Sequence, residues 1–156
     1  MKPRTIGLTL LVAATAFAPT LAMAQEHSHY VNARAYLRTA QTLMRVPERP
    51  NVQLTLKPAD DQVEAAVREI DRAGVVSRKD AVDHPAIKQD PRKLDDVDRF
   101  SGIVDLLRAA RNEIQQETND SHAEWRNAVI KDVGAALESV HKAAIDAHLD
   151  RSIGDF

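Results

Sequence analysis

Residues 121–147 read SHAEWRNAVIKDVGAALESVHKAAIDA, and their apolar side chains recur at steps of three and four. That spacing is the period of an α-helix with one apolar face. Ser121, followed three residues later by Glu124, matches a capping box, so we expect the helix to start there and run to about Asp150. Its predicted inward stripe consists of Trp125, Val129, Val133, Ala136, Val140, Ala143 and Ala147.

Three upstream segments show the same period, over about residues 28–45, 59–82 and 92–118. Pro47 and Pro50 end the first segment, and Asp83-His84-Pro85 ends the second. Apolar and polar side chains alternate over much of residues 46–58, so this stretch is predicted to be an extended linker. The predicted inward stripes of these helices comprise Tyr30, Ala33, Leu37, Ala40, Met44, Val63, Ala66, Val67, Ile70, Ala73, Val97, Phe100, Val104, Leu107, Arg111 and Ile114.

Four amphipathic helices with few glycines and aromatic residues indicate an all-α protein. Helices of this kind bury their apolar faces against one another, and short connections favour antiparallel neighbours. We therefore predict an antiparallel four-helix bundle in up-down-up-down order, forming a single domain over residues 25–156.

The first 24 residues have the pattern of a secretory signal peptide. Lys2 and Arg4 precede an apolar run over residues 6–18, and Ala22-Met23-Ala24 supplies the small-residue cleavage pattern. The apolar run is too short to span a bilayer. We expect cleavage after Ala24 and a mature protein in the periplasm or secreted, with no membrane span after cleavage.

The composition excludes several classes of function. The chain of 156 residues has no cysteine, which rules out disulfides, thiolate zinc sites, cysteine-linked haem and thiol catalysis. The formal net charge is −2, and it is more negative without the two basic residues of the leader. Because this balance lacks the basic footprint of a nucleic-acid-binding protein, no nucleic-acid partner is expected.

Several short motifs occur together in the mature chain. Residues 100–144 contain Leu106-Leu107-Arg108-Ala109-Ala110, Ile114 and Trp125-Arg126-Asn127, and the upstream part contains His29-Tyr30, Leu37-Arg38-Thr39-Ala40, Glu69-Ile70-Asp71 and Asp83-His84-Pro85. With these motifs the chain resembles a family of small exported bacterial all-helical proteins of unknown function. The resemblance implies a helical bundle without an assigned activity. Members of that family also carry histidines where this chain has Ser101, Arg111 and Asp132.

The six histidines are the residues whose arrangement suggests chemistry. In the expected up-down-up-down order, three parts of the chain lie at one pole of the bundle. They are the start of the first helix, the connection between the second and third helices, and the end of the fourth helix. This pole would gather His27, His29, His84 and His148, with His141 two turns further in and His122 at the opposite pole. Imidazoles from separate elements bind transition metals, and Asp83 or Asp146 could complete the ligand shell. The sequence therefore predicts a copper-like metal site at this pole.

A second metal site depends on processing alone. Cleavage after Ala24 would expose Gln25-Glu26-His27, with an imidazole third from a free amine. The amine, two deprotonated amides and the imidazole can surround Cu(II) or Ni(II) in a square plane. Cyclisation of Gln25 would abolish this site.

No arrangement of serines, histidines and carboxylates predicts catalysis, so an enzyme is not expected. The expected function is that of an exported binding protein that holds a transition metal at its histidine-bearing end. The alternative is a helical interaction or envelope-stress protein without a ligand. Its best anchors would be Trp125 and Arg126, because Trp and Arg dominate interface hot spots, although Trp125 lies on the apolar stripe and is expected in the core.

Overall fold

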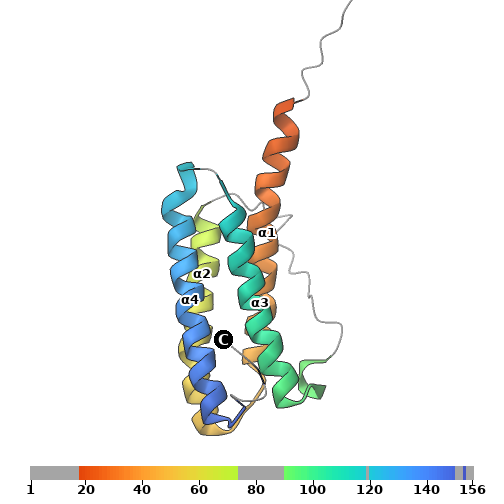
Figure 1. Cartoon of the computed structure of the whole chain (residues 1–156), viewed down its shortest axis with the longest axis vertical. Coiled ribbons are helices and arrows are strands. Elements are labelled where there is room, and N and C mark those ends of the chain that lie inside the picture. Colours follow the sequence, from red (N-terminus) through yellow and green to blue (C-terminus); the bar gives the residue numbers. More distant parts are fainter. Residues whose placement is uncertain (1–17, 74–89, 119, 150–152, 154–156) are drawn as a thin grey trace, which may run out of the picture.

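The structure is a computed structural model that describes residues 18–73, 90–118, 120–149 and 153, with residues 18–28 and 120 as backbone only. Four helices form a bundle (Figure 1): α1 (Ala18–Met44), α2 (Pro50–Arg72), α3 (Asp96–Gln116) and α4 (Ala123–Asp146). Two single-turn 3-10 helices, η1 (Pro91–Lys93) and η2 (Asp120–His122), precede α3 and α4. The described residues contain no strand, so the predicted all-α four-helix bundle is confirmed.

Contacts between helix ends reveal the direction of each helix. At the upper pole, near the first described side chain of α1, His29 contacts Glu113 near the end of α3, and Arg34 contacts Asp71 at the end of α2. The ring of Tyr30 contacts His122, directly before α4. The ends of α2 and α3 and the start of α4 therefore lie at the pole where α1 begins within the bundle.

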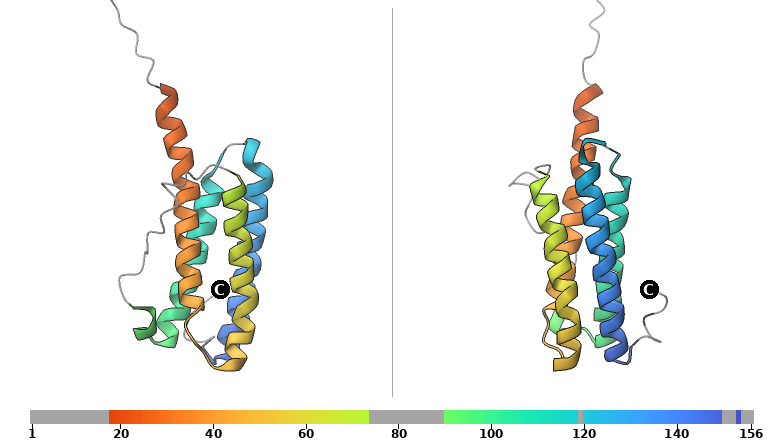
Figure 2. Two further views of the ribbon diagram at one scale, coloured as in Figure 1. Left: turned by 180° about the vertical axis from the view of Figure 1, so that it is seen from behind. Right: turned by 90° about the vertical axis from the view of Figure 1, so that its left-hand side faces the viewer.

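Contacts at the lower pole show that the opposite ends of the four helices meet there. Glu48, just after α1, forms an ion pair with Arg99 in the first turn of α3. Near the start of α2, the Thr55 hydroxyl donates to Asp146 at the end of α4 at 2.6 Å. Helices α2 and α3 therefore run in the same direction, opposite to α1 and α4 (Figure 2). The expected strict alternation along the chain is wrong, although neighbouring helices that pack together are antiparallel.

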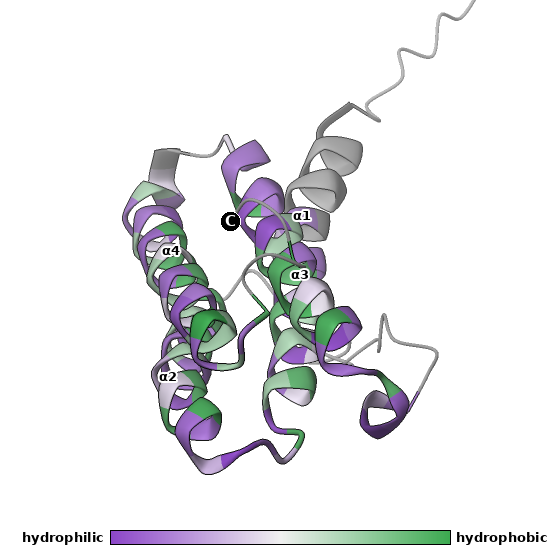
Figure 3. Cartoon of the chain, turned by 60° about the horizontal axis from the view of Figure 1, so that its bottom comes forward, coloured by the Kyte–Doolittle hydropathy of each residue, from purple (hydrophilic) through white to green (hydrophobic). Residues whose placement is uncertain are grey.

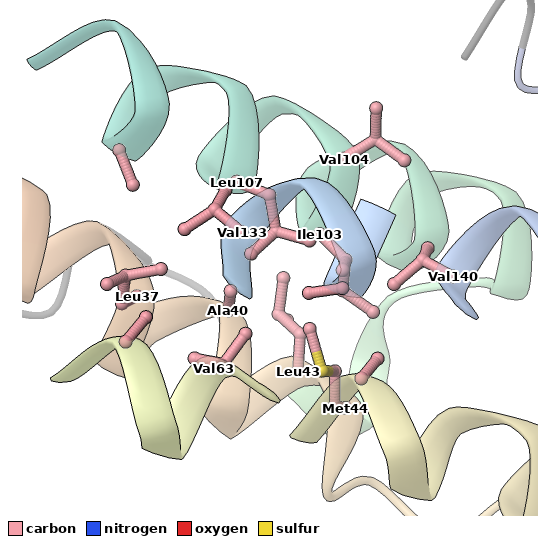
Figure 4. Close-up of a cluster of buried hydrophobic side chains, with 14 of the residues drawn as sticks. Leu37, Ala40, Leu43, Met44, Val63, Ile103, Val104, Leu107, Val133 and Val140 are labelled. Atoms are coloured by element: carbon pink, nitrogen blue, oxygen red, sulfur yellow. The ribbon is translucent and has the colours of Figure 1, made fainter. Parts of the chain in front are cut away.

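Each helix buries one apolar stripe (Figures 3 and 4). Leu37, Ile70, Leu107 and Val140 come from the four different helices, and all are fully buried, as predicted. Four predicted inward residues are not in the core: Arg111 is exposed, and Val97, Ala73 and Trp125 are half-buried. The helical period therefore predicted most of the core, with errors at the margins of the stripes.

The predicted linker over residues 46–58 is wrong over most of its length, because α2 begins at Pro50. Val52 and Leu56 are buried, whereas Leu54 is 74% exposed, as expected for a helix. Pro50 occupies the first turn, where a missing N–H costs nothing. Pro58 lies inside the helix on its exposed side, so water can reach the Leu54 carbonyl that loses its usual donor.

The helix ends differ partly from expectation. Asp95 caps α3 by accepting a 2.8 Å hydrogen bond from the Asp98 amide. The N-cap of α4 is His122 instead of the predicted Ser121, and the His122 side chain makes no capping bond. The structure ends α2 at Arg72, and its predicted continuation to Val82 falls on residues outside the described ranges.

A polar seam joins α1 to α2. Gln41 is almost completely buried, and its amide nitrogen donates to Asp60 at 3.2 Å and to Glu64 at 3.1 Å. Arg38 donates to the same Glu64 carboxylate at 2.6 Å, and Arg45 donates to Asp60 at 3.1 Å. Side-chain hydrogen bonds and ion pairs therefore hold this edge of the bundle.

Within the described ranges, no helix is long and apolar enough to cross a membrane.

Candidate functional site

The structure does not bring the predicted histidine cluster together. His29 lies at the upper pole, where its Nδ1 is 2.7 Å from Glu113 Oε2. His148 follows α4 at the lower pole, two residues after Asp146. The two histidines are separated because α4 runs parallel to α1, so its end cannot reach the start of α1. The proposed shared site of His29 and His148 is therefore wrong.

The other residues of the predicted metal sites lie mostly outside the described ranges. The side chain of His27, the whole of His84 and the candidate ligand Asp83 lie outside what the structure describes. Asp146, the other proposed carboxylate ligand, accepts the Thr55 hydrogen bond. Among the described residues, no group of three or more His, Asp or Glu side chains could hold a metal ion. The N-terminal copper or nickel site on Gln25-Glu26-His27 stays a prediction.

Three rings meet at the upper pole instead. The rings of Tyr30 and His122 lie edge to face with centroids 6.0 Å apart, and the rings of His122 and Trp125 are tilted with centroids 5.4 Å apart. These contacts join the middle of α1, where this helix enters the bundle, to η2 and the first turn of α4. We call Tyr30, His122 and Trp125 the aromatic pole. It places His122 on the same side of the bundle as His29, opposite to the expected position.

Tyr30 forms the buried base of the aromatic pole. Its side chain is 1% exposed, and its hydroxyl finds no hydrogen-bond partner among the described residues. Burial, reinforced by the negative charge of Glu117 and partly offset by Arg126, raises the pKa of Tyr30 to about 12. The phenol is therefore neutral at physiological pH and acts as an apolar ring with a donor, not as a base.

Two residues close the connection between α3 and α4 beside these rings. Glu117 ends α3, and its side chain is buried. Arg126, in the first turn of α4, donates from Nη1 to the Glu117 carbonyl oxygen at 2.8 Å. This bond satisfies a carbonyl at the end of a helix and fixes α4 relative to α3. The turn of α4 that carries Trp125 is thus held in place.

Trp125 is partly exposed instead of lying in the core, so its predicted burial is wrong. The Trp125 ring contacts His122 on one side, and the residue is only partly buried. A supported, half-open tryptophan can receive an apolar side chain from another molecule. Sequence reasoning identified Trp125 as an anchor but missed its association with Tyr30, because the position of Tyr30 on an apolar stripe indicated only core packing.

The lower pole contains a different polar site that the sequence did not indicate. Arg99 is buried and forms ion pairs with Glu48 and with Asp96, the latter at 2.8 Å. Burial lowers the pKa of Arg99, yet guanidinium keeps its proton at any physiological pH. These pairs bind the α1–α2 turn to the start of α3, which makes the site a structural clamp. Glu48 lies in the supposed linker, so nothing in the sequence pattern connected it to Arg99.

Comparison with protein-family models, with curated proteins and with solved structures finds no match in any of the three. The resemblance to exported helical proteins of unknown function therefore stays a prediction that depends on the quoted motifs.

Proposed function

We propose that this protein is an exported, non-enzymatic binding protein whose aromatic pole binds a partner protein. The observation that carries the proposal is the partly buried Trp125, whose ring contacts His122, while His122 in turn contacts the buried Tyr30. Export is supported by the leader pattern of residues 1–24. Metal binding by a shared histidine pole is no longer the favoured function, because His29 and His148 lie at opposite ends of the bundle.

The aromatic pole has the properties of an interface anchor. Tryptophan contributes more to protein interfaces than most residues, because it buries a large apolar area with few rotatable bonds. Contacts with His122, and the Arg126 bond to Glu117 in the same turn, already restrict the Trp125 ring and its backbone. A partner would therefore lose little side-chain entropy on binding. The expected partner is a protein segment that places an apolar side chain on this ring.

Site-specific photocrosslinking in cells that export the protein tests this function. A benzophenone amino acid in place of Trp125 should yield a crosslinked product of one defined mass. The same amino acid at Leu54, which is 74% exposed near the lower pole, is the matched control and should not yield that product. Identical products from both positions would contradict the proposal.

A second pair of variants tests whether capture of the partner depends on the Trp125 ring itself. The benzophenone amino acid at Glu124, an exposed neighbour, should trap the same partner while Trp125 is intact. Adding Trp125→Ala should remove that product, because the anchor is lost while the crosslinker remains in place. A product that survives Trp125→Ala would show that the partner does not use the aromatic pole.

A further inference from the structure

Gly134 lies in the middle of α4, where glycine costs about 1 kcal/mol of helix stability relative to alanine. A close helix contact within the bundle would explain a glycine here, but a Cβ added at Gly134 would meet nothing within 4 Å. Gly102 on α3 is different, because its added Cβ would lie 3.3 Å from Leu43 Cδ1. Among the described residues, packing within the bundle therefore gives no reason for a glycine at position 134.

The surface around Gly134 is hollowed. A groove of about 580 Å³ lies between α3 and α4, lined by Arg111, Gly134, Leu137, Glu138 and His141. Leu137 is half-buried and supplies apolar surface, while Arg111 and Glu138 are exposed. Without a side chain at Gly134, another helix could approach the α4 backbone closely at this point. The groove thus has the shape and the apolar surface to receive a helix.

Charges on α4 flank this glycine with opposite signs. Lys131 lies one turn before Gly134, and Glu138 lies one turn after it. Both side chains are exposed, and neither makes an ion pair within the described part of the chain. Ile145, seven residues after Glu138, continues the same face and is 46% exposed. The outer face of α4 therefore combines two charges that have no ion-pair partner among the described residues, a gap at Gly134 and an exposed apolar side chain.

We propose that a second copy of this chain packs antiparallel on α4, centred at Gly134, and forms a two-fold dimer. In an antiparallel pair centred between Gly134 and Ala135, Lys131 of each copy lies opposite Glu138 of the other. The two ion pairs form together because the surface is its own complement. A different protein would need a matching pattern of its own, whereas this chain already carries both halves. The centre of this interface lies in the middle of α4, whereas Trp125 of the aromatic pole lies in the first turn of that helix.

Sedimentation equilibrium of the purified protein over a wide concentration range tests the dimer. Wild type should show a monomer–dimer equilibrium. Lys131→Glu and Glu138→Lys should each weaken dimerisation tenfold or more, because each places like charges opposite one another twice. The double variant Lys131→Glu/Glu138→Lys should restore the dimer, since the signs are exchanged but still complementary. Gly134→Arg should abolish it while circular dichroism shows an intact helical fold, because the monomer has room at this position.

Asp105→Lys is the matched control, since it makes the same charge change as Glu138→Lys at an exposed residue of α3 that does not line the groove. It should leave dimerisation unchanged. A wild-type protein that stays monomeric at millimolar concentration would overturn the proposal. A wild-type dimer that persists in Gly134→Arg, or a double variant that does not recover, would show that any association uses another face.

Discussion

The Tyr30 hydroxyl lies at the base of the aromatic pole, and burial opposes its ionisation. Below pH 10 the phenol is neutral in both the folded and the unfolded chain. Above pH 10 the unfolded chain loses this proton, while the folded chain keeps it until about pH 12. The free energy of unfolding should therefore fall as pH rises through this window, with Tyr30 contributing a loss of roughly 2–3 kcal/mol.

Urea unfolding at pH 9 and at pH 11.5, compared between wild type and Tyr30→Phe, isolates this contribution from other alkaline titrations. The Phe variant should be less sensitive to alkaline pH. It should also be more stable at neutral pH by about 1 kcal/mol, because it removes a buried hydroxyl with no partner among the described residues. If the free energy of unfolding falls equally in both proteins between pH 9 and pH 11.5, Tyr30 ionises freely in the folded state.

Leu107 is completely buried on α3. Leu107→Ala should lower the free energy of unfolding by about 2–5 kcal/mol, because it removes buried methylenes and leaves a cavity among neighbours that relax only partly. Chemical denaturation gives this value directly. Leu54→Ala on the exposed side of α2 is the control and should change it by less than about 0.5 kcal/mol. A loss of that small size at Leu107 would contradict its burial.

Between α1 and α2, the polar seam depends on the ionised carboxylate of Glu64. The Gln41 hydrogen bond, followed by the Arg38 hydrogen bond and charge, lowers the pKa of Glu64 below its usual value. A lowered pKa gives stability that is present above the unfolded value near 4.5 and is lost as pH falls through the folded value. Glu64→Gln should therefore make unfolding less dependent on pH below about 5. Urea titrations at pH 3–6 measure this, and an unchanged acid dependence would exclude Glu64 as a contributor.

The sequence predicted the number of helices and most of their buried residues because a helical stripe is a local property. The direction of each helix was not predictable in the same way, since an apolar stripe does not indicate at which pole of the bundle the next helix begins. The prediction of an extended segment over residues 46–58 failed because Val52, Leu54 and Leu56 alternate with polar residues, which is a strand-like period. The spacing of Val52, Leu56 and Ala59 also fits one face of a helix, and that is the pattern the structure follows. The error in helix direction then placed His122 and His148 at the wrong poles of the bundle.

At the N-terminus, α1 begins at Ala18 and so overlaps the end of the predicted leader. Because Ala22-Met23-Ala24 carries the cleavage pattern, the exported protein should begin at Gln25, which leaves the bundle-forming part of α1 in place. Intact-mass spectrometry of protein recovered from the periplasm identifies the N-terminal residue. A mass that includes residues 1–24 would contradict cleavage.

Helix α1 packs most extensively on α3, and α2 packs most extensively on α4, so each main partner lies two helices away along the chain. His29 and Glu113 are 84 residues apart, and Thr55 and Asp146 are 91 residues apart. This high contact order should slow folding relative to a bundle of consecutive hairpins. During synthesis, the first two helices cannot bury their apolar faces until the last two exist. A fragment that ends at Ala73 should therefore show little helical circular dichroism, and a chain on its way to a secretion pore should still be unfolded and able to thread through it.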